Sequence, residues 1–235
     1  MSEESRLQIL KRASGAPPGA PDATLVVHEI YVSLQGESTW AGLPCAFVRL
    51  SACHLRCVWC DTPHAFDQGE RRALDDVVAD VHGRGVTLVE VTGGEPLLQP
   101  AVYPLMTRLC DFGHTVLLET SGSLDISRVD ARVVKIMDLK CPGSGEAGHN
   151  RWENLPLLGP RDEIKFVLAD RADYEWARDV IRQHDLAADH TVLLSVAHGQ
   201  LAPAEVARWM LEDALPARFQ LQLHKVIWDP TARGV

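Results

Sequence analysis

Three cysteines lie within eight residues of one another, in the segment Cys53-His-Leu-Arg-Cys57-Val-Trp-Cys60. Their short spacers can turn all three sulfurs toward one metal centre. Three thiolates leave a tetrahedral ion or a four-iron cluster one ligand short. A structural site would fill that position with a fourth side chain, whereas a catalytic site would leave it to a cofactor or a substrate.

A structural zinc site is one interpretation of this segment. His64 would complete Cys-x3-Cys-x2-Cys-x3-His, the ligand set of a Cys3His zinc-binding module with no reaction of its own. The spacing leaves this alternative open. Zinc modules of that kind usually form small basic domains, whereas this segment lies in a large acidic chain and follows a predicted strand. We therefore favour a centre with an open coordination position.

The chain is acidic and nearly half apolar. It has 235 residues, 46% of them apolar, and a net charge of −9 at pH 7 with histidine neutral. This charge weighs against nucleic acid or an anionic membrane as the main partner. No apolar run approaches the roughly 20 residues of a membrane span, and no signal-peptide pattern opens the chain. We expect a cytoplasmic protein with reduced cysteines, in which a clustered trio indicates metal binding.

The pattern predicts one α/β domain after a flexible lead-in. Residues 1–23 include a Pro/Gly-rich run and form the lead-in, and residues 24–235 form the domain. We expect strands at 25–32, 45–50, 87–91, 115–118, 133–137, 163–168, 191–194 and 219–224, and helices near 73–83, 101–111, 172–184 and 203–213. Strands alternating with helices indicate parallel strands in about six βα units, too few to close a full barrel.

In such folds the active site lies at the carboxyl ends of the strands. Polar residues gather there, and the segment Thr92-Gly-Gly-Glu-Pro96 is the most informative of them. Its two glycines let a ligand approach the backbone closely, and Glu95 can accept hydrogen bonds from an ammonium group. Alone, the segment would equally suit an ordinary turn between a strand and a helix.

Together, the two motifs resemble those of the radical S-adenosylmethionine (SAM) enzymes: Cys53-x3-Cys57-x-Trp59-Cys60, then Gly93-Gly94-Glu95-Pro96. The resemblance implies a modified, partial (βα)6 barrel whose cysteines hold a [4Fe–4S] cluster, with SAM on the fourth iron. It also implies that the glycine motif holds the methionyl ammonium and that Trp59 lies near the adenine. In such enzymes an electron from the cluster cleaves SAM, and the 5′-deoxyadenosyl radical abstracts a hydrogen atom.

A closer resemblance, from about residue 25 to the end, is to the 7-carboxy-7-deazaguanine synthases of queuosine and 7-deazapurine biosynthesis. It rests on Leu34-Gln-Gly-Glu37, Cys60-Asp-Thr62, Thr92 before the glycines, Glu119-Thr-Ser-Gly122 and Leu223-His-Lys225. That family converts 6-carboxy-5,6,7,8-tetrahydropterin to 7-carboxy-7-deazaguanine and ammonia, uses SAM catalytically and requires Mg2+. The resemblance implies a carbon–nitrogen lyase whose radical comes from SAM, and we assign no residue as its acid or base.

The resemblance also implies which residues contact each ligand. Thr62 would bind Mg2+, and Arg49 would meet the substrate carboxylate, because a guanidinium fork fits a planar anion. The other implied substrate contacts are Leu34, Gln35, Gly36, Glu37, Thr92, His224 and the terminal carboxylate of Val235. The implied SAM contacts are Trp59, Gly93, Gly94, Glu95, Glu119, Ser121, Lys140, Ser195 and His198.

Two segments depart from the family pattern. Asp138-Leu139-Lys140 stands where other members have Ser-Pro-Lys, so only Lys140 is carried over, and Ser195-Val-Ala-His198 is a looser match. A glycyl-radical enzyme activase has the same cysteine spacing and a similar Asp-Leu-Lys element, and it is the alternative enzyme function. For the synthase we expect a homodimer, a small-molecule pterin substrate and an electron donor such as flavodoxin or ferredoxin.

Overall fold

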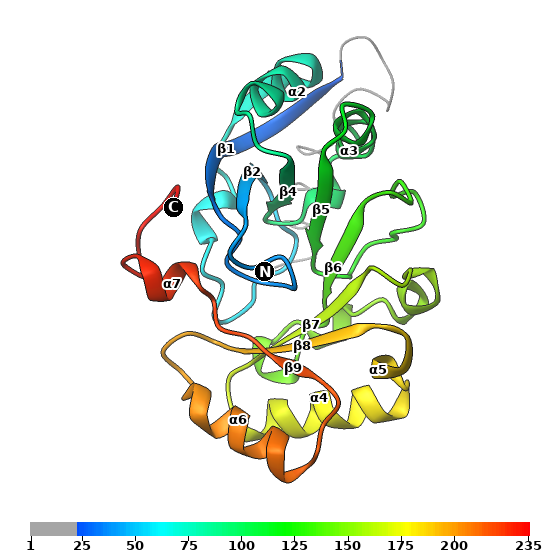
Figure 1. Cartoon of the computed structure of the whole chain (residues 1–235), viewed down its shortest axis with the longest axis vertical. Coiled ribbons are helices and arrows are strands. Elements are labelled where there is room, and N and C mark those ends of the chain that lie inside the picture. The colour runs from blue at the N-terminus through cyan, green and yellow to red at the C-terminus, as the bar shows by residue number, and fades with distance from the viewer. Residues whose placement is uncertain (1–22) are drawn as a thin grey trace.

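The computed structural model describes residues 23–235, and within them nine strands form one curved sheet (Figure 1). The strands are β1 (Thr24–Leu34), β2 (Pro44–Leu50), β3 (Glu70–Ala73), β4 (Leu88–Gly93), β5 (Thr115–Thr120), β6 (Val134–Asp138), β7 (Glu163–Leu168), β8 (Thr191–Val196) and β9 (Arg218–Phe219). The α-helices are α2 (Leu74–Gly83), α3 (Val102–Asp111), α4 (Arg171–Gln183), α5 (Leu186–Asp189), α6 (Pro203–Glu212) and α7 (His224–Ile227). Short 3-10 helices are η1 (Pro63–Ala65), η2 (Pro96–Leu98), η3 (Pro142–Ser144), η4 (Ala147–His149) and η5 (Trp152–Leu157).

The sheet is a partial barrel. Its strand order is β3-β1-β2-β4-β5-β6-β7-β8-β9, with parallel pairing from β2 to β9 and antiparallel pairing of β1 with β2 and β3. Within the described residues the two edge strands, β3 and β9, do not pair with each other, so the barrel stays open. The predicted fold class is therefore confirmed. No helix in residues 23–235 is long and apolar enough to cross a membrane.

Some predicted elements were wrong. The strand expected at 219–224 is only the two-residue β9, because the chain then leaves the sheet: Leu223 N donates to the Gly36 carbonyl (2.9 Å) and α7 begins at His224. The connections from β5 to β6 and from β6 to β7 contain no α-helix; in the second of them Pro142 begins η3 and Pro156 lies inside η5. Residues 1–22 of the predicted lead-in lie outside the described residues.

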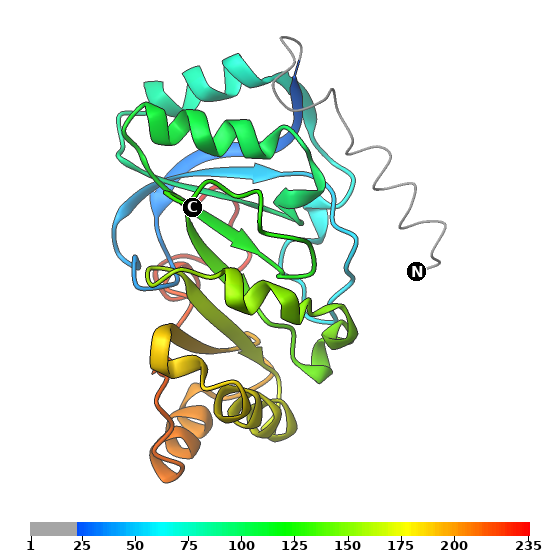
Figure 2. The same cartoon turned by 90° about the vertical axis from the view of Figure 1, so that its right-hand side faces the viewer.

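The parallel strands present different side chains on their two faces, because alternate residues of a strand point in opposite directions. Outer residues pack against the helices in two apolar clusters, one under α2 and α3 and the other under α4 and α6. Figure 2 shows α2 and α3 side by side on that outer surface. Inner residues near the amino ends of the strands form a smaller apolar cluster: Cys45, Phe47, Leu88, Leu117, Val134 and Ile136.

Toward the carboxyl ends, the same inner face becomes polar. The inner positions there are occupied by Arg49, Glu90, Thr92, Glu119, Asp138 and Lys165. The parallel register places Arg49 beside Thr92 and Asp138 beside Lys165 on neighbouring strands. The alternation that gives the sheet an apolar floor therefore also gives it a charged layer above that floor.

The connection after β5 depends on the fully buried Asn154 for its shape. The Asn154 amide donates to the carbonyl groups of Gly122 (3.0 Å) and Leu124 (2.8 Å). Asn154→Ala would remove both of these buried hydrogen bonds, although the Gly122 carbonyl keeps the Arg151 backbone N–H as a donor, so we expect the free energy of unfolding in urea to fall by about 1–3 kcal/mol. The exposed neighbour variant Glu153→Ala should change it by less than about 0.5 kcal/mol. An equal loss in the two variants would contradict this role of Asn154.

Candidate active site

A cavity of about 270 Å³ opens at the carboxyl ends of the parallel strands. Its walls come from the loop after β1, the loop that carries the three cysteines (residues 52–62, the cysteine loop), the ends of β2 and β4 to β7, and the C-terminal segment. Figure 1 shows that segment, with α7, returning to lie beside β1 and β2. The cavity therefore lies where sequence reasoning placed the active site.

Most of the predicted site residues line this cavity. They are Leu34, Gln35, Gly36, Glu37, Arg49, Cys53, Cys57, Trp59, Cys60, Thr62, Thr92, Gly93, Gly94, Glu119, Ser121, Lys140, His198, His224 and Val235. Two predicted residues, Glu95 and Ser195, are not among the lining residues of the described chain. Segments far apart in sequence are thus brought to one place, while two side chains point elsewhere.

Glu95 fastens the end of β4 to the end of β5. Its carboxylate is fully buried and accepts hydrogen bonds from Leu97 N (3.1 Å), Thr120 Oγ1 (2.9 Å), Ser121 N (2.8 Å) and Ser121 Oγ (2.5 Å). Donors of the protein itself thus occupy the Glu95 oxygens, and the contact of Glu95 with SAM stays a prediction.

Ser195 lies near the end of β8, behind the cavity wall, and its contact with SAM stays a prediction. Its hydroxyl group is buried and has no hydrogen-bond partner among the described residues. The wall beside it is made by Ala197 and His198, the next residues along the chain. A ligand would thus meet the loop after β8 rather than the strand.

Hydrogen bonds of Arg56, both within the cysteine loop and to a neighbouring connection, stabilise the conformation of this loop. The Arg56 guanidinium donates to the carbonyl groups of Cys53 (2.7 Å) and Leu55 (2.6 Å). Its backbone N–H donates to Glu146 Oε1 (2.8 Å), in the connection between β6 and β7. The loop conformation therefore does not depend on the three thiol groups alone.

Glycine at position 94 lets the end of β4 pack directly on the cysteine loop. A Cβ atom there would lie 2.3 Å from the Ala52 carbonyl oxygen and 2.7 Å from Cβ of Cys53. The backbone N–H of Gly94 donates to the Leu50 carbonyl (3.1 Å), and that of Glu95 to the Ala52 carbonyl (2.8 Å). Any side chain at position 94 would push the two motifs apart.

The three sulfurs suit an iron–sulfur cluster better than one zinc ion. Tetrahedral zinc with bonds of about 2.3 Å would hold its sulfurs about 3.8 Å apart. Within the described residues, the three sulfurs belong to no group of ligand atoms that all lie within 4.8 Å of one another. A four-iron cluster separates its thiolates further, because each binds a different iron. His64, the fourth ligand of the zinc alternative, instead lies within 4.8 Å of ligand atoms of His28 and Glu29.

Among the charged cavity residues that sequence reasoning missed, Glu90 and Lys165 lie within strands. Each interrupts an apolar strand, and a charge in a buried strand must be paired or must face a site. That interruption was the available signal. Glu90 accepts a hydrogen bond from the Gln35 amide, and Lys165 forms ion pairs with Glu37 and Glu119.

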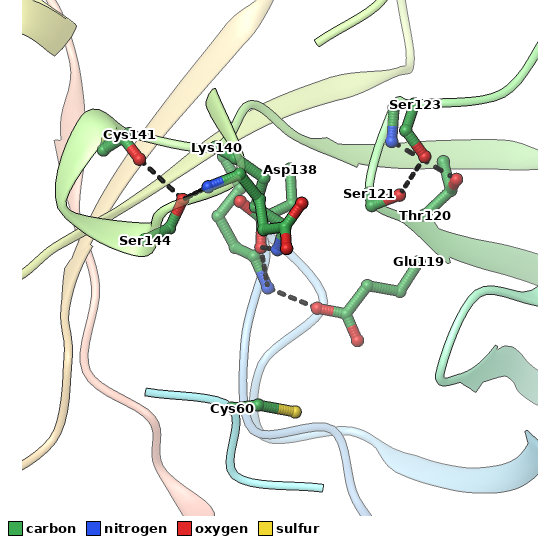
Figure 3. A network of polar contacts seen from close by, with 12 residues as sticks. Cys60, Glu119, Thr120, Ser121, Ser123, Asp138, Lys140, Cys141 and Ser144 are labelled. Atoms are coloured by element: carbon green, nitrogen blue, oxygen red, sulfur yellow. Dashed lines mark hydrogen bonds and ion pairs between the residues drawn. The ribbon is translucent and has the colours of Figure 1, made fainter. Parts of the chain in front are cut away.

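The charges of this layer are strongly coupled. Burial would raise the pKa of Glu119, but the Lys165 ammonium, with a hydrogen bond from Thr92 Oγ1, lowers it to about 2. Lys140 Nζ lies 2.8 Å from Asp138 Oδ2. Figure 3 shows Glu119, Asp138 and Lys140 around one space, with Cys60 on its opposite side. Ionised groups thus remain available close to the sulfurs.

Arg49 is positioned by two side chains of β1. Its Nε donates to Glu29 Oε1 (2.8 Å) and its Nη2 to the Tyr31 hydroxyl (3.0 Å). Asp61, after the last cysteine, accepts from Lys225 Nζ (2.8 Å), and this ammonium lowers the pKa of Asp61 to about 2 although burial opposes the shift. The C-terminal segment is therefore tied to the cysteine loop.

Comparison with known proteins agrees with this geometry. Residues 48–183 match the sequence model of the Radical SAM superfamily. The chain is 49% identical over 224 residues to a 7-carboxy-7-deazaguanine synthase of Koribacter versatilis, covering 89% of this chain and 99% of the relative. It is 46% identical over 217 residues to a 7-carboxy-7-deazaguanine synthase of Chlorobaculum tepidum, covering 91% and 99%. The crystal structure of QueE from Escherichia coli has the same fold, with a TM-score of 0.71 at 21% identity over 95% of this chain and all of that one.

Glu90 should give the free energy of unfolding a distinct pH dependence. Burial, and then the Glu119 carboxylate, raise its pKa from 4.5 to about 8. Between these two values the unfolded chain releases a proton that the folded protein keeps, so stability falls as the pH rises. Relative to wild type, Glu90→Gln should therefore gain up to about 1.4 kcal/mol of unfolding free energy per pH unit over that range. Urea denaturation at several pH values measures this, and a difference that does not vary with pH would contradict it.

Proposed function

The chain belongs to the radical SAM superfamily and, within it, to the 7-carboxy-7-deazaguanine synthases, and we propose that its cavity performs that ring contraction. The reaction converts 6-carboxy-5,6,7,8-tetrahydropterin to 7-carboxy-7-deazaguanine with loss of ammonia, a carbon–nitrogen lyase step of queuosine and 7-deazapurine biosynthesis. The relatives favour this function over a glycyl-radical activase and over a zinc module. The observation that carries it is one cavity lined by both the three sulfurs and a layer of paired charges.

Cys53, Cys57 and Cys60 would hold the [4Fe–4S] cluster, with SAM beside it. When bound, the cluster supplies the electron that turns SAM into an agent of hydrogen-atom abstraction. Burial, and then the Glu95 carboxylate, raise the pKa of the Cys53 thiol to about 12, so bound iron is needed to keep this sulfur as a thiolate. Gly93 and Gly94 leave the space next to the sulfurs free of side chains.

The remaining SAM contacts follow from charge and shape. The Glu119 carboxylate is ionised and can accept hydrogen bonds from the ribose hydroxyl groups, while Lys140 can bind the SAM carboxylate. Trp59 offers an aromatic surface to the adenine. Ser121 and His198 line the same part of the cavity.

The substrate side is built around two fixed planar groups. Glu29 and Tyr31 hold the Arg49 guanidinium, whose planar fork suits the substrate carboxylate. The Gln35 amide is oriented by Glu90. Its carbonyl oxygen accepts from the Glu37 backbone N–H (3.1 Å).

Further substrate contacts come from three segments of the domain. Leu34 and Gly36 lie on the loop after β1, Thr92 at the end of β4, and His224 and Val235 in the C-terminal segment. Burial lowers the pKa of His224 below 6.5, so we assign it a neutral imidazole that hydrogen bonds to the pterin. These residues position the substrate, because a primary radical attacks whatever lies nearest.

Thr62 would bind Mg2+ next to the cluster. Its hydroxyl oxygen lies 3.9 Å from the Cys60 sulfur and lines the cavity. Mg2+ keeps most of its water and accepts few protein ligands, so a single hydroxyl together with substrate oxygens is a suitable set. The ion and Arg49 would together hold the substrate carboxylate.

We also propose a homodimer, a cytoplasmic location and reduction by a flavodoxin or a ferredoxin. Exposed apolar side chains at Leu221, Val226 and Ile227 of the C-terminal segment are suited to a contact between subunits. Residues 24–235 would form the one catalytic domain, preceded by the lead-in. Light scattering of the purified protein tests the dimer.

The function is tested by anaerobic reconstitution and turnover. The wild type should bind about four irons per chain, turn brown, and form a deazaguanine chromophore from the carboxytetrahydropterin. Cys57→Ser should lose cluster and product, whereas Cys110→Ser, whose residue lies outside the cavity lining, should keep both. A full cluster without product would favour the activase, and colourless protein containing zinc would favour the zinc module.

Thr62→Ala should separate substrate turnover from SAM cleavage. If Mg2+ orients the substrate, losing its protein ligand should slow product formation by about tenfold or more, since small misplacements are costly. Reductive cleavage of SAM should change less, because the cluster ligands are intact. Chromatography of 5′-deoxyadenosine and product measures both rates, with Thr107→Ala on α3 as control. Full turnover of Thr62→Ala with Mg2+ present would exclude the metal-positioning role.

A further inference from the structure

Lys165 is the most deeply buried charge of the cavity wall. It lies on the inner face of β7, and its side chain is 4% exposed. An ammonium group in such a place is strongly unfavourable unless carboxylates surround it. Burial opposes protonation, but Glu119, Glu37 and Asp138 raise the pKa of Lys165 well above its ordinary value. The Lys165 ammonium therefore stays charged, and it needs these carboxylates to remain close to it.

The carboxylates around Lys165 come from three segments with different tasks. Glu37 lies 2.9 Å from Lys165 Nζ and belongs to the substrate loop after β1. Glu119, at the end of β5, contacts the same ammonium and is assigned to the SAM ribose. Asp138 lies 3.9 Å away and also binds Lys140. One ammonium thus joins the substrate side of the cavity to the SAM side.

The exposures of these groups show how Lys165 can act. The Glu119 side chain is 31% exposed and that of Glu37 is 17% exposed, whereas that of Lys165 is 4% exposed. The two carboxylates are therefore more open to ligands than the ammonium group behind them. Lys165 must therefore influence the reaction through the position of its partners.

The five charged groups of this cluster do not balance one another. Glu37, Glu119 and Asp138 oppose the ammonium groups of Lys140 and Lys165, which leaves one net negative charge. That charge complements a sulfonium nucleoside. Without Lys165, Glu37 and Glu119 would repel each other across the cavity.

We propose that Lys165 is a positioning residue that sets the distance between the substrate and SAM by holding Glu37 and Glu119 on one ammonium group. This inference rests on the proposed function. Loss of Lys165 should let the two ligands shift relative to each other, so that hydrogen abstraction from the substrate fails more often than SAM cleavage. The enzyme would then consume SAM without completing turnover.

The test compares Lys165→Met with a matched control, Lys135→Met. Lys135 is also a buried lysine on a parallel strand, paired with Asp162 at 2.8 Å, but it is not among the residues lining the cavity. Both variants lose a buried ion pair, so general destabilisation should affect both. Only Lys165→Met should alter the relation between the two ligands.

Two measurements decide the question. The first is the amount of 5′-deoxyadenosine released per deazaguanine formed, which is low while SAM is regenerated. It should rise about tenfold or more in Lys165→Met at equal cluster content and stay unchanged in Lys135→Met. The second is the Kd of the carboxytetrahydropterin for protein without SAM, measured by calorimetry. This Kd should rise about tenfold in Lys165→Met and stay unchanged in Lys135→Met, because only the first variant removes the partner of Glu37.

The inference would be overturned if Lys165→Met kept both the wild-type ratio of 5′-deoxyadenosine to deazaguanine and the wild-type affinity for the pterin. Equal changes in the two lysine variants would also overturn it. If Lys165→Met does not fold, Lys165→Arg decides: its larger fork displaces both carboxylates and should raise the 5′-deoxyadenosine ratio severalfold, and an unchanged ratio overturns the inference. A wild-type enzyme that forms no deazaguanine would instead refute the proposed function.

Discussion

The close packing of the cysteine loop against the Gly93-Gly94 turn is the constraint on which the rest of the structure depends. With no side chain at Gly94, the turn lies against Ala52 and Cys53, and the Glu95 backbone N–H donates to the Ala52 carbonyl. Glu95 then fixes the same turn to the end of β5. The proposed metal ligands and the proposed SAM-binding backbone therefore form one rigid unit, so that the relation between a cluster and SAM would not rely on flexible side chains.

Above this unit, the protein uses buried charges that can exist only as a set. Lys165 needs its carboxylates, Glu119 keeps its ionised form through Lys165, and the pKa of Glu90 is raised because burial and the Glu119 carboxylate outweigh the influence of Lys165. Such a set would cost stability in a closed core. At the open end of a barrel it provides fixed dipoles and charges for a ligand that itself is charged, which is the arrangement that electrostatic preorganisation requires.

Much of the fold and of the candidate site could be predicted from the sequence, and the features that were not predicted have identifiable physical reasons. The strand ends were found because apolar alternation stops where Thr92, Glu119 and Asp138 begin the polar layer. Motif spacing cannot reveal which way a side chain points, and it gave no sign that the Glu95 carboxylate accepts hydrogen bonds from Leu97 N and Thr120 Oγ1.

Lys165 and Glu90 were not predicted because they lie within strands and belong to none of the motifs at the strand ends. The short β9 and α7 depend on a tertiary contact, Leu223 with Gly36, that no local pattern contains. Local periodicity thus locates the elements, while long-range hydrogen bonds decide how the C-terminal segment closes the cavity.

The two ligand sites are contributed by different parts of the chain. In the proposed assignment most SAM contacts come from the middle of the sequence, from the cysteine loop to Lys140, with His198 after β8, whereas the substrate side depends mainly on the loop at Gln35–Glu37 and the C-terminal segment. Gln222 Nε2 donates to Glu37 Oε1 (2.9 Å), and Leu223 binds Gly36, so the two substrate segments support each other. Because these contacts lie outside the SAM side, the substrate pocket can change while the radical-generating half stays constant. The ion pairs of Lys165 are then the physical link that keeps the two halves in register.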